Sequence, residues 1–342
     1  MNVYFSGIGG SGISSLAHIA LDSGLAVFGS DSQSNSSVQS LIARGATITI
    51  EQNFNEIQQI HQSHPIDWIV RTAGLPVNHP HIYFAKQNKI KITKRDEFIN
   101  WIIIKNNLKL IAVAGTHGKT TTTGMLVWIF KQLKLPVSYL IGSQVSFGQS
   151  GAYEKDSKFF VLECDEFDKN FLKYNPFGTI ITTIDFDHPD IYKNIQDYRN
   201  AFAQYFSKVT QVGVAYKDHL LKAKLLKQFN RLPIHLSINS KEIDLLAKGN
   251  LSLAGLHNRQ NAMLAVLMMD QIIDDIQIQN SSQISTKIEY LISLVNTFPG
   301  TYRRFEKITN NVFSDYAHHP DEIKATLNMA KELQNQRLNF DK

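Results

Sequence analysis

Residues 115–121, with the sequence GTHGKTT, bring two glycines, a lysine and threonines together in one short loop. Glycines let the backbone fold closely enough for successive N–H groups to face one anion, and a lysine adds a mobile positive charge. A threonine hydroxyl beside bound phosphates is a typical magnesium ligand. The usual phosphate-loop pattern has a further glycine where this chain has Val113. A strand–turn–helix with chance glycines is the alternative, but the lysine–threonine pair favours an ATP site.

Acidic side chains follow two predicted buried strands, at Lys158–Glu163 and Gly178–Ile184. The carboxyl ends of parallel strands meet at one edge of a sheet, so we expect these acids beside the phosphate loop, where magnesium needs oxygen ligands. A solvated acidic turn and a structural histidine are the alternatives. The residues concerned are Cys164, Asp165, Glu166 and Asp168 after the first strand, and Asp185, Asp187 and His188 after the second.

A second glycine-rich turn lies near the N-terminus. Gly7, Gly9 and Gly12 have the G-x-G-x-x-G spacing after a predicted strand at Asn2–Ser6. Asp31 closes the next predicted strand. Such glycines allow close approach to a pyrophosphate, and such an acid can accept a hydrogen bond from a ribose hydroxyl. The motif alone leaves two ligands open, a nicotinamide dinucleotide or another pyrophosphate-linked nucleotide such as a UDP-sugar.

Polar side chains also gather at a predicted helix start. His257 and Asn258 stand there, and Asn261 falls on the same face one turn later. Amides at this place either cap the helix or contact a base or phosphate. After a break at residues 298–300, Arg304 belongs to a pair of adjacent arginines.

Near the C-terminus a strand is predicted at Val312–Tyr316, and Asp315 lies at its end. His318 and His319 follow before Pro320. Adjacent histidines in an extended chain point to opposite faces, so a turn is the better interpretation. The helix predicted after them runs to about residue 333.

Strands and helices alternate around these motifs. Residues 1–107 and 108–298 each read as strand–helix units, with further strands at Ala26–Ser30 and Trp68–Thr72. We therefore expect an α/β protein. Its parts would be an N-terminal Rossmann-like domain (1–107), a central P-loop ATPase-like α/β domain (108–298) and only the start of a third α/β domain (299–342).

Composition narrows the function classes. The 342 residues carry a formal charge of +5, with lysines spread along the chain, so we expect anionic small-molecule ligands and no nucleic-acid partner. Cys164 is the only cysteine, which excludes an internal disulfide. The N-terminus has no basic leader, and no apolar stretch reaches the length of a membrane span. We expect a cytoplasmic protein without a membrane partner.

Motifs along nearly the whole chain resemble the Mur ligase family of peptidoglycan synthesis, most closely the member that adds the first amino acid. Their order, rather than any single motif, makes the resemblance specific. They are GIGGSGISSLA (7–17), AGTHGKTTTT (114–123), ECDEFDKNFL (163–172), IDFDHPDIY (184–192), HNRQNA (257–262), FPGTYRRFE (298–306) and DYAHHPDEIKATL (315–327).

The resemblance implies site residues. Lys119, Glu163 and His188 would be catalytic, and Thr120 would join Glu163 and His188 in binding magnesium ions. The implied ATP-binding residues are Gly115, Thr116, His117, Gly118, Lys119, Thr120, Thr121, His257, Asn258, Asn261, Arg304 and Asp315. Those implied around the pyrophosphate and nucleoside of UDP-N-acetylmuramate are Gly7, Gly9, Gly10, Ser11, Gly12 and Asp31.

The implied reaction joins L-alanine to the carboxylate of UDP-N-acetylmuramate. That carboxylate attacks the γ-phosphate of ATP, and the alanine amine then displaces phosphate through a tetrahedral intermediate. Bringing anions together requires cations, which Lys119 and magnesium would supply. Positioning of the reacting groups contributes most of the remaining catalysis.

The chain departs from the family pattern in two ways. Thr183 stands where the family usually has asparagine, which affects local hydrogen bonding. Residues 299–342 match only the start of the C-terminal domain, so we expect a fragment or a truncated product. Two further interpretations stay open, a non-catalytic nucleotide-binding module and a ligase that reattaches a recycled peptide to the same sugar nucleotide. A nicotinamide oxidoreductase would leave the phosphate loop without a function.

Overall fold

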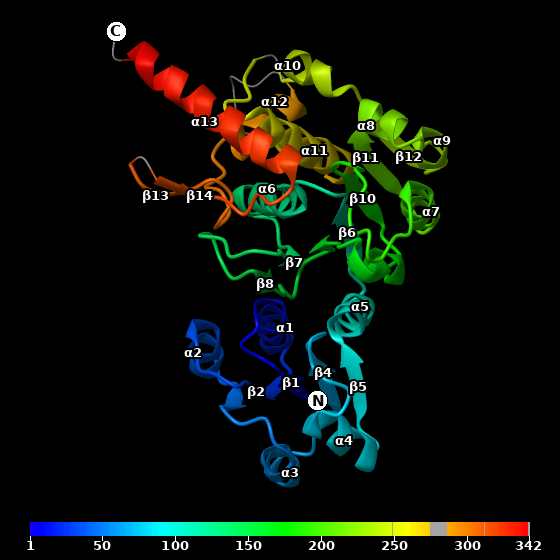
Figure 1. Ribbon diagram of the computed structural model, residues 1–342, viewed down its shortest axis with the longest axis vertical. Coiled ribbons are helices and arrows are strands. Elements are labelled where there is room, and N and C mark those ends of the chain that lie inside the picture. The colour runs from blue at the N-terminus through cyan, green and yellow to red at the C-terminus, as the bar shows by residue number, and fades with distance from the viewer. Residues whose placement is uncertain (248, 274–285, 311, 341–342) are drawn as a thin grey trace. The chain divides into compact units, whose positions relative to one another are not determined.

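The computed structural model of the protein describes residues 1–247, 249–273, 286–310 and 312–340. They form two compact α/β units (Figure 1), which confirms the predicted fold class. The predicted boundaries of three domains stay a prediction. The first unit comprises Met1–Leu108, Pro136–Gly142 and Gln149–Phe160, and the second comprises Lys109–Leu135, Ser143–Gly148 and Val161–Lys342.

The first unit contains a parallel sheet with the strand order β3-β2-β1-β4-β5. Its central strand is buried almost throughout, which explains an uninterrupted apolar run instead of an alternating one. The strands are β1 (Asn2–Ser6), β2 (Ala26–Ser30), β3 (Thr47–Thr49), β4 (Trp68–Arg71) and β5 (Lys91–Lys94). The helices between and after them are α1 (Ser11–Asp22), α2 (Ser36–Ala43), α3 (Phe54–Ser63), α4 (Pro80–Gln87) and α5 (Arg95–Lys105).

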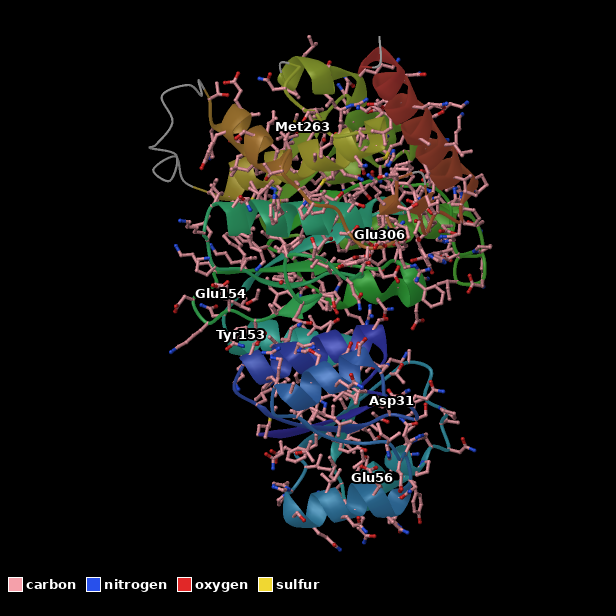
Figure 2. The ribbon with its side chains drawn as sticks, turned by 90° about the vertical axis from the view of Figure 1, so that its left-hand side faces the viewer. Asp31, Glu56, Tyr153, Glu154, Met263 and Glu306 are labelled. Atoms are coloured by element: carbon pink, nitrogen blue, oxygen red, sulfur yellow. The ribbon has the colours of Figure 1, made fainter. Side chains whose placement is uncertain are left out.

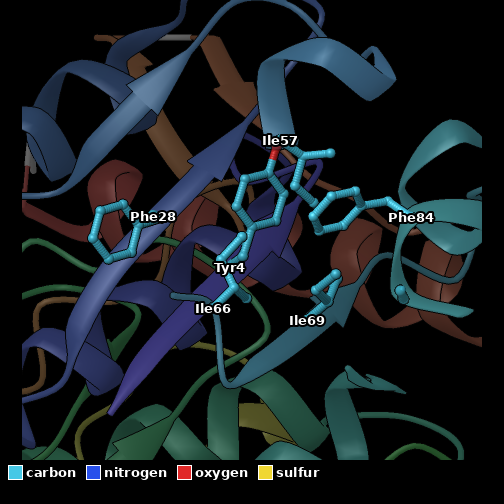
Figure 3. Packing of buried hydrophobic residues seen from close by; sticks show 7 residues of the cluster. Tyr4, Phe28, Ile57, Ile66, Ile69 and Phe84 are labelled. Atoms are coloured by element: carbon cyan, nitrogen blue, oxygen red, sulfur yellow. The ribbon is translucent and has the colours of Figure 1, made fainter. Parts of the chain in front are cut away.

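Aromatic and branched side chains form the core of this unit, and Figure 3 shows them around the ring of Tyr4. The Tyr4 hydroxyl lies 2.7 Å from Ser30 Oγ and 3.0 Å from Glu56 Oε2. Glu56 is itself buried and accepts a further hydrogen bond from Thr49. The ring therefore packs in the core while its hydroxyl supplies a partner to a buried acid.

A seven-stranded mixed sheet has the order β12-β11-β10-β6-β9-β7-β8. Its strands are β6 (Lys109–Ala114), β7 (Ser138–Leu140), β8 (Gly151–Ala152), β9 (Phe159–Glu163), β10 (Gly178–Ile181), β11 (Val212–Tyr216) and β12 (Ile234–Ile238). The strand predicted over Gly178–Ile184 ends at Ile181. The chain after it bonds to the loop that follows β6, because the Thr183 carbonyl accepts from the Thr116 N–H.

Helices α6 (Lys119–Gln132), α11 (Leu256–Ile272) and α12 (Lys287–Val295) pack against one another in the second unit (Figure 1). The methionines of α11 are core residues, as the fully buried Met263 (Figure 2) illustrates. Further helices among the described residues are α7 (Ile195–Phe206), α8 (Lys217–Lys222), α9 (Leu226–Phe229) and α10 (Ile243–Leu246), with 3₁₀ segments at Phe167–Lys173 and Ser240–Glu242.

The C-terminal part consists of an antiparallel pair, β13 (Glu306–Thr309) and β14 (Val312–Ser314), followed by α13 (Pro320–Phe340). The strand predicted over Val312–Tyr316 therefore ends earlier, and the helix predicted to end near residue 333 is longer. Within the described ranges, no helix combines the length and apolar character that a bilayer crossing requires.

The substitution Tyr4→Phe is expected to lower the free energy of unfolding by about 1–3 kcal/mol, because Glu56 then stays buried with one partner fewer. Urea unfolding measures this difference. Tyr83→Phe is the matched control, since the Tyr83 side chain is exposed and its hydroxyl accepts only from Gln87 among the hydrogen bonds of the described residues. We expect a change within about 0.5 kcal/mol there, and equal losses in the two variants would contradict a stabilising buried network.

Candidate functional site

The loop between β6 and α6 makes two turns that require glycine. Gly115 has a φ of 128° and Gly118, which precedes the first residue of α6, has a φ of 82°. A Cβ at Gly115 would lie 2.4 Å from Thr182 Oγ1, and one at Gly118 would lie 2.5 Å from Asn261 Oδ1. The loop is thus held against the end of β10 on one side and against α11 on the other, with the N-terminus of α6 open to an anion.

Hydrogen bonds to the segment after β10 fix the loop. The Thr116 N–H donates to the Thr183 carbonyl, and the His117 N–H donates to Thr183 Oγ1, both at 2.9 Å. Thr116 Oγ1 also donates to the carbonyl of Asp185. The threonine that replaces the family's usual asparagine therefore still supplies an acceptor to the loop.

Lys119, the lysine of the loop, is held by a buried acid. Its Nζ lies 2.7 Å from Glu166 Oε2 and 4.0 Å from Asp165 Oδ1. Burial acts to lower the pKa of Lys119, but the charges of Glu166, Asp165 and Glu163 outweigh it and raise the pKa overall. Burial likewise raises the pKa of Glu166 more than the lysine charge lowers it. Lys119 therefore carries a positive charge, and its contact with Glu166 holds that charge next to the phosphate loop.

The predicted metal ligands Thr120, Glu163 and His188 take part in two separate contacts. Thr120 Oγ1 donates to Glu163 Oε1 at 2.8 Å, as expected for neighbours at the ends of α6 and β9. His188 lies near Glu166, with 4.0 Å between Nε2 and Oε1. Asp165 and Glu166, which lie near it, are among the acids that the sequence predicted beside the phosphate loop.

The segments that carry these acids and His188 contain unusual backbone. His188, Asp168 and Lys169 have φ values of 56°, 53° and 54° without being glycine. A left-handed conformation at such residues costs roughly 1 kcal/mol or more and persists where the surroundings fix it. The surroundings therefore hold the backbone of these segments in a defined conformation.

A divalent cation fits the donor set. Glu166 Oε1 is buried and has no hydrogen-bond partner among the described residues. Asp165, Glu166 and His188 offer ligand atoms that all lie within 4.8 Å of one another. Carboxylate oxygens are the ligands that magnesium prefers, and the unpartnered oxygen is the kind of atom that a cation would satisfy.

A cavity of about 490 Å³ adjoins the phosphate loop, within the usual size of small-molecule sites. It brings together predicted ATP-binding residues from distant parts of the chain. Those that line it are His117, Gly118, Thr121, His257, Asn258, Asn261, Arg304 and Asp315.

Hydrogen bonds and burial fix the positions of several residues that line this cavity. Asn258 Nδ2 donates to the Ala254 carbonyl, so its amide braces the start of α11, while Asn261 is buried beside Gly118. Asp315 accepts from the N–H groups of Phe305 and Ala317. Burial lowers the pKa of His257, the first of the three on α11.

His117 extends from the loop to the start of α13. Its Nδ1 lies 3.1 Å from Glu322 Oε1. Burial acts to raise the pKa of Glu322, but the hydrogen bonds from His117 and from the His318 N–H, with the Arg304 charge, bring it to about 2. Glu322 is thus an anion at neutral pH.

In the first unit, the structure places Asp31 (Figure 2) against the glycine turn. Its Oδ2 accepts from the Gly9 N–H at 2.7 Å, and its Oδ1 accepts from the Ser32 N–H at 2.8 Å. A guanidinium lies at the same turn, because a Cβ at Gly12 would come within 2.8 Å of Arg95 Nη1. At this turn Asp31 fixes the backbone by accepting from the Gly9 N–H, and Arg95 supplies a positive charge of the kind that binds a pyrophosphate.

Reasoning from the sequence missed Glu322 and Arg95 as site residues, and it placed Glu166 beside the phosphate loop as a magnesium candidate without the contact to Lys119. Glu322 belonged to a recognised motif but had no assigned partner. Arg95 is the first residue of α5, far from the glycines in the chain, and no spacing rule connects the two.

Comparisons with known proteins agree with this arrangement. The family model described as "Mur ligase family, catalytic domain" matches residues 2–106, and that described as "Mur ligase middle domain" matches residues 113–269. A UDP-N-acetylmuramate–L-alanine ligase of Clostridium kluyveri is 34% identical over 98% of this chain and 76% of its own length. One of Clostridium acetobutylicum is 31% identical over 98% of this chain and 75% of its own length.

Two solved structures share the fold. The UDP-N-acetylmuramate-alanine ligase of Thermotoga maritima superposes with a TM-score of 0.76 at 24% identity, covering 97% of this chain and 78% of that one. A murein peptide ligase of Psychrobacter arcticus gives 0.72 at 23% identity, covering 97% and 76%.

The chain belongs to the Mur ligase family. It is an ATP-binding ligase of peptidoglycan precursor synthesis, as the sequence motifs predicted.

Gly118→Ala is expected to weaken ATP binding by at least about tenfold, because the added Cβ meets Asn261 and opposes a positive φ. Titration calorimetry with ATP measures the loss. Gly249→Ala is the matched control, since Gly249 has a φ of 70° and no atom within 4 Å of its Cβ position. Equal loss of ATP affinity in both variants would mean that the contact with Asn261 has no role.

Glu322→Gln is expected to reduce stability at neutral pH by about 1–3 kcal/mol. The folded pKa of Glu322 is about 2, below that of an unfolded glutamate, so its contribution is present above about pH 5 and is lost as the pH falls toward 2. Urea unfolding of both proteins between pH 3 and pH 7 should show the difference shrinking at low pH. A difference that grows on acidification would contradict this sign.

Proposed function

We propose that this chain joins L-alanine to the carboxylate of UDP-N-acetylmuramate, with ATP and Mg²⁺, through an acyl-phosphate intermediate. The observation that carries the proposal is that Lys119, Thr120 and Glu163 come together at the phosphate loop. The loop adjoins the cavity that residues of α11 help to line. The substrates are those in the names of the Clostridium ligases to which the chain is similar.

The phosphate loop would hold the triphosphate. Backbone N–H groups at the start of α6 face the anion, and Lys119 balances negative charge on the transferred phosphoryl group. His257, Asn261 and Arg304 line the cavity where the rest of the nucleotide would lie. Little covalent chemistry falls to these side chains, since they bind and orient the reacting groups.

Thr120, Glu163 and His188 would hold Mg²⁺, with Asp165 and Glu166 as further oxygen donors. When bound, magnesium supplies positive charge that stabilises the phosphates during transfer. Glu163 keeps the Thr120 hydroxyl oriented, and Glu166 keeps Lys119 at the loop.

The first unit would bind the sugar nucleotide at its glycine turn. Gly7, Gly9, Gly10, Ser11 and Gly12 surround the N-terminus of α1, a place suited to a pyrophosphate. Asp31 would act there by holding the Gly9 N–H, and the guanidinium of Arg95 would add positive charge.

The test is phosphate release from ATP in the presence of UDP-N-acetylmuramate and L-alanine. We expect release that depends on alanine, is abolished by EDTA and is restored by Mg²⁺. Lys119→Met should lower it by at least about a hundredfold, a loss typical of a transition-state contact, whereas the exposed Lys227→Met should not change it. Phosphate release that depends neither on alanine nor on Lys119 would overturn the assignment.

A second candidate is a ligase that attaches a peptide to the same sugar nucleotide, because ligases of this kind share the fold. Replacing alanine in the assay by the tripeptide L-alanyl-γ-D-glutamyl-meso-diaminopimelate separates the two. Binding of ATP without turnover with either acceptor would instead support a non-catalytic nucleotide-binding module.

A further inference from the structure

The side chain of His117 has a contact that the proposed reaction does not use. It stands between the two glycines of the phosphate loop, and only 14% of the side chain is exposed. Its Nδ1 meets Glu322 of α13 rather than a residue near the loop in sequence. The contact thus connects the triphosphate-binding loop directly to the first turn of the C-terminal helix.

The chemistry of the pair fixes the histidine tautomer. An ionised carboxylate only accepts hydrogen bonds, so His117 Nδ1 must carry a proton and donate it to Glu322. Nε2 is then the nitrogen that holds the lone pair in the neutral ring. It is buried and has no hydrogen-bond partner among the described residues. The ring orientation therefore depends on the bond at Nδ1.

Glu322 is itself held in place. Its Oε2 accepts from the His318 N–H at 3.3 Å, and 14% of its side chain is exposed. The His117 ring also lies 4.7 Å from the ring of His319, the residue before α13. A rigid carboxylate on one side and a neighbouring ring on the other leave His117 little freedom to rotate.

We propose that Glu322 is a positioning residue that acts through His117. By fixing the tautomer and orientation of that ring, it holds the phosphate loop in the conformation that binds a triphosphate, so that loss of the Glu322 carboxylate lowers the affinity of the loop for ATP. The inference rests on the proposed ATP site.

A second carboxylate of α13 provides a matched control. Glu332 Oε1 accepts from Arg259 Nη1 at 2.7 Å, so it also ties α13 to the second unit, but through α11 rather than through the phosphate loop. If docking of α13 were the only role of such ties, neutralising either acid would have the same effect. A role specific to the loop predicts different effects.

The experiment compares ATP affinity by titration calorimetry in the whole chain and in Glu322→Gln and Glu332→Gln. We expect Glu322→Gln to bind ATP at least about tenfold more weakly, as for loss of a hydrogen bond to a charged group. Glu332→Gln should change the affinity by less than about twofold. Equal losses would overturn this role of Glu322 alone, whereas absence of ATP binding by the unsubstituted chain would overturn the proposed function and the role of Glu322 with it.

Two histidine variants and a spectroscopic readout test the tie itself. Asparagine places an amide N–H near the position of Nδ1 and glutamine places it near Nε2, so His117→Asn should bind ATP more tightly than His117→Gln. Nitrogen-15 NMR of labelled histidine, which needs no nucleotide, should show a protonated Nδ1 on His117 that loses this signature in Glu322→Gln. A proton on Nε2 and none on Nδ1 would overturn the hydrogen bond from His117 Nδ1 to Glu322 and the proposal with it.

Discussion

The close approach of residues 115–118 to their neighbours is the constraint on which the rest of the second unit depends. A side chain at Gly115 would strike the segment after β10, and one at Gly118 would strike Asn261 of α11. Because neither has a Cβ, the segment after β10 reaches the loop and bonds to it. The start of α6 is thereby aimed at one place, and Lys119 and Thr120 reach their acidic partners from its first turn.

Charge balance then links the lysine to the acids around it. A phosphate that engages Lys119 competes with Glu166, whose side chain is fully buried. A buried carboxylate that loses its partner costs several kcal/mol. A divalent cation near Asp165 and His188 would offset that cost, because it supplies new positive charge to the same acid. Under the proposed function, the metal would thus replace the positive charge that Glu166 loses when Lys119 turns to the nucleotide.

Much of this arrangement was predictable from the sequence, because periodicity and glycine spacing report on local backbone. The phosphate loop, β1 and β2 belong to that part. The contact of His117 with Glu322 does not, since only the folded chain brings together residues so distant in sequence. The early end of β10 escaped prediction for a similar reason, because its apolar sequence continues while its backbone turns to bond the loop.

Asp31 shows where spacing rules leave two answers. An acid at the end of β2 can accept from a ribose hydroxyl or from the backbone of the glycine turn, and the same position serves both. Here the N–H groups of Gly9 and Ser32 donate to the two oxygens, but each carboxylate oxygen accepts more than one hydrogen bond, so these contacts do not exclude a ribose hydroxyl. The Gly9 N–H itself is directed at the carboxylate. Positive charge for an anion at this turn must then come from elsewhere, and the guanidinium of Arg95, packed against Gly12, is placed to supply it.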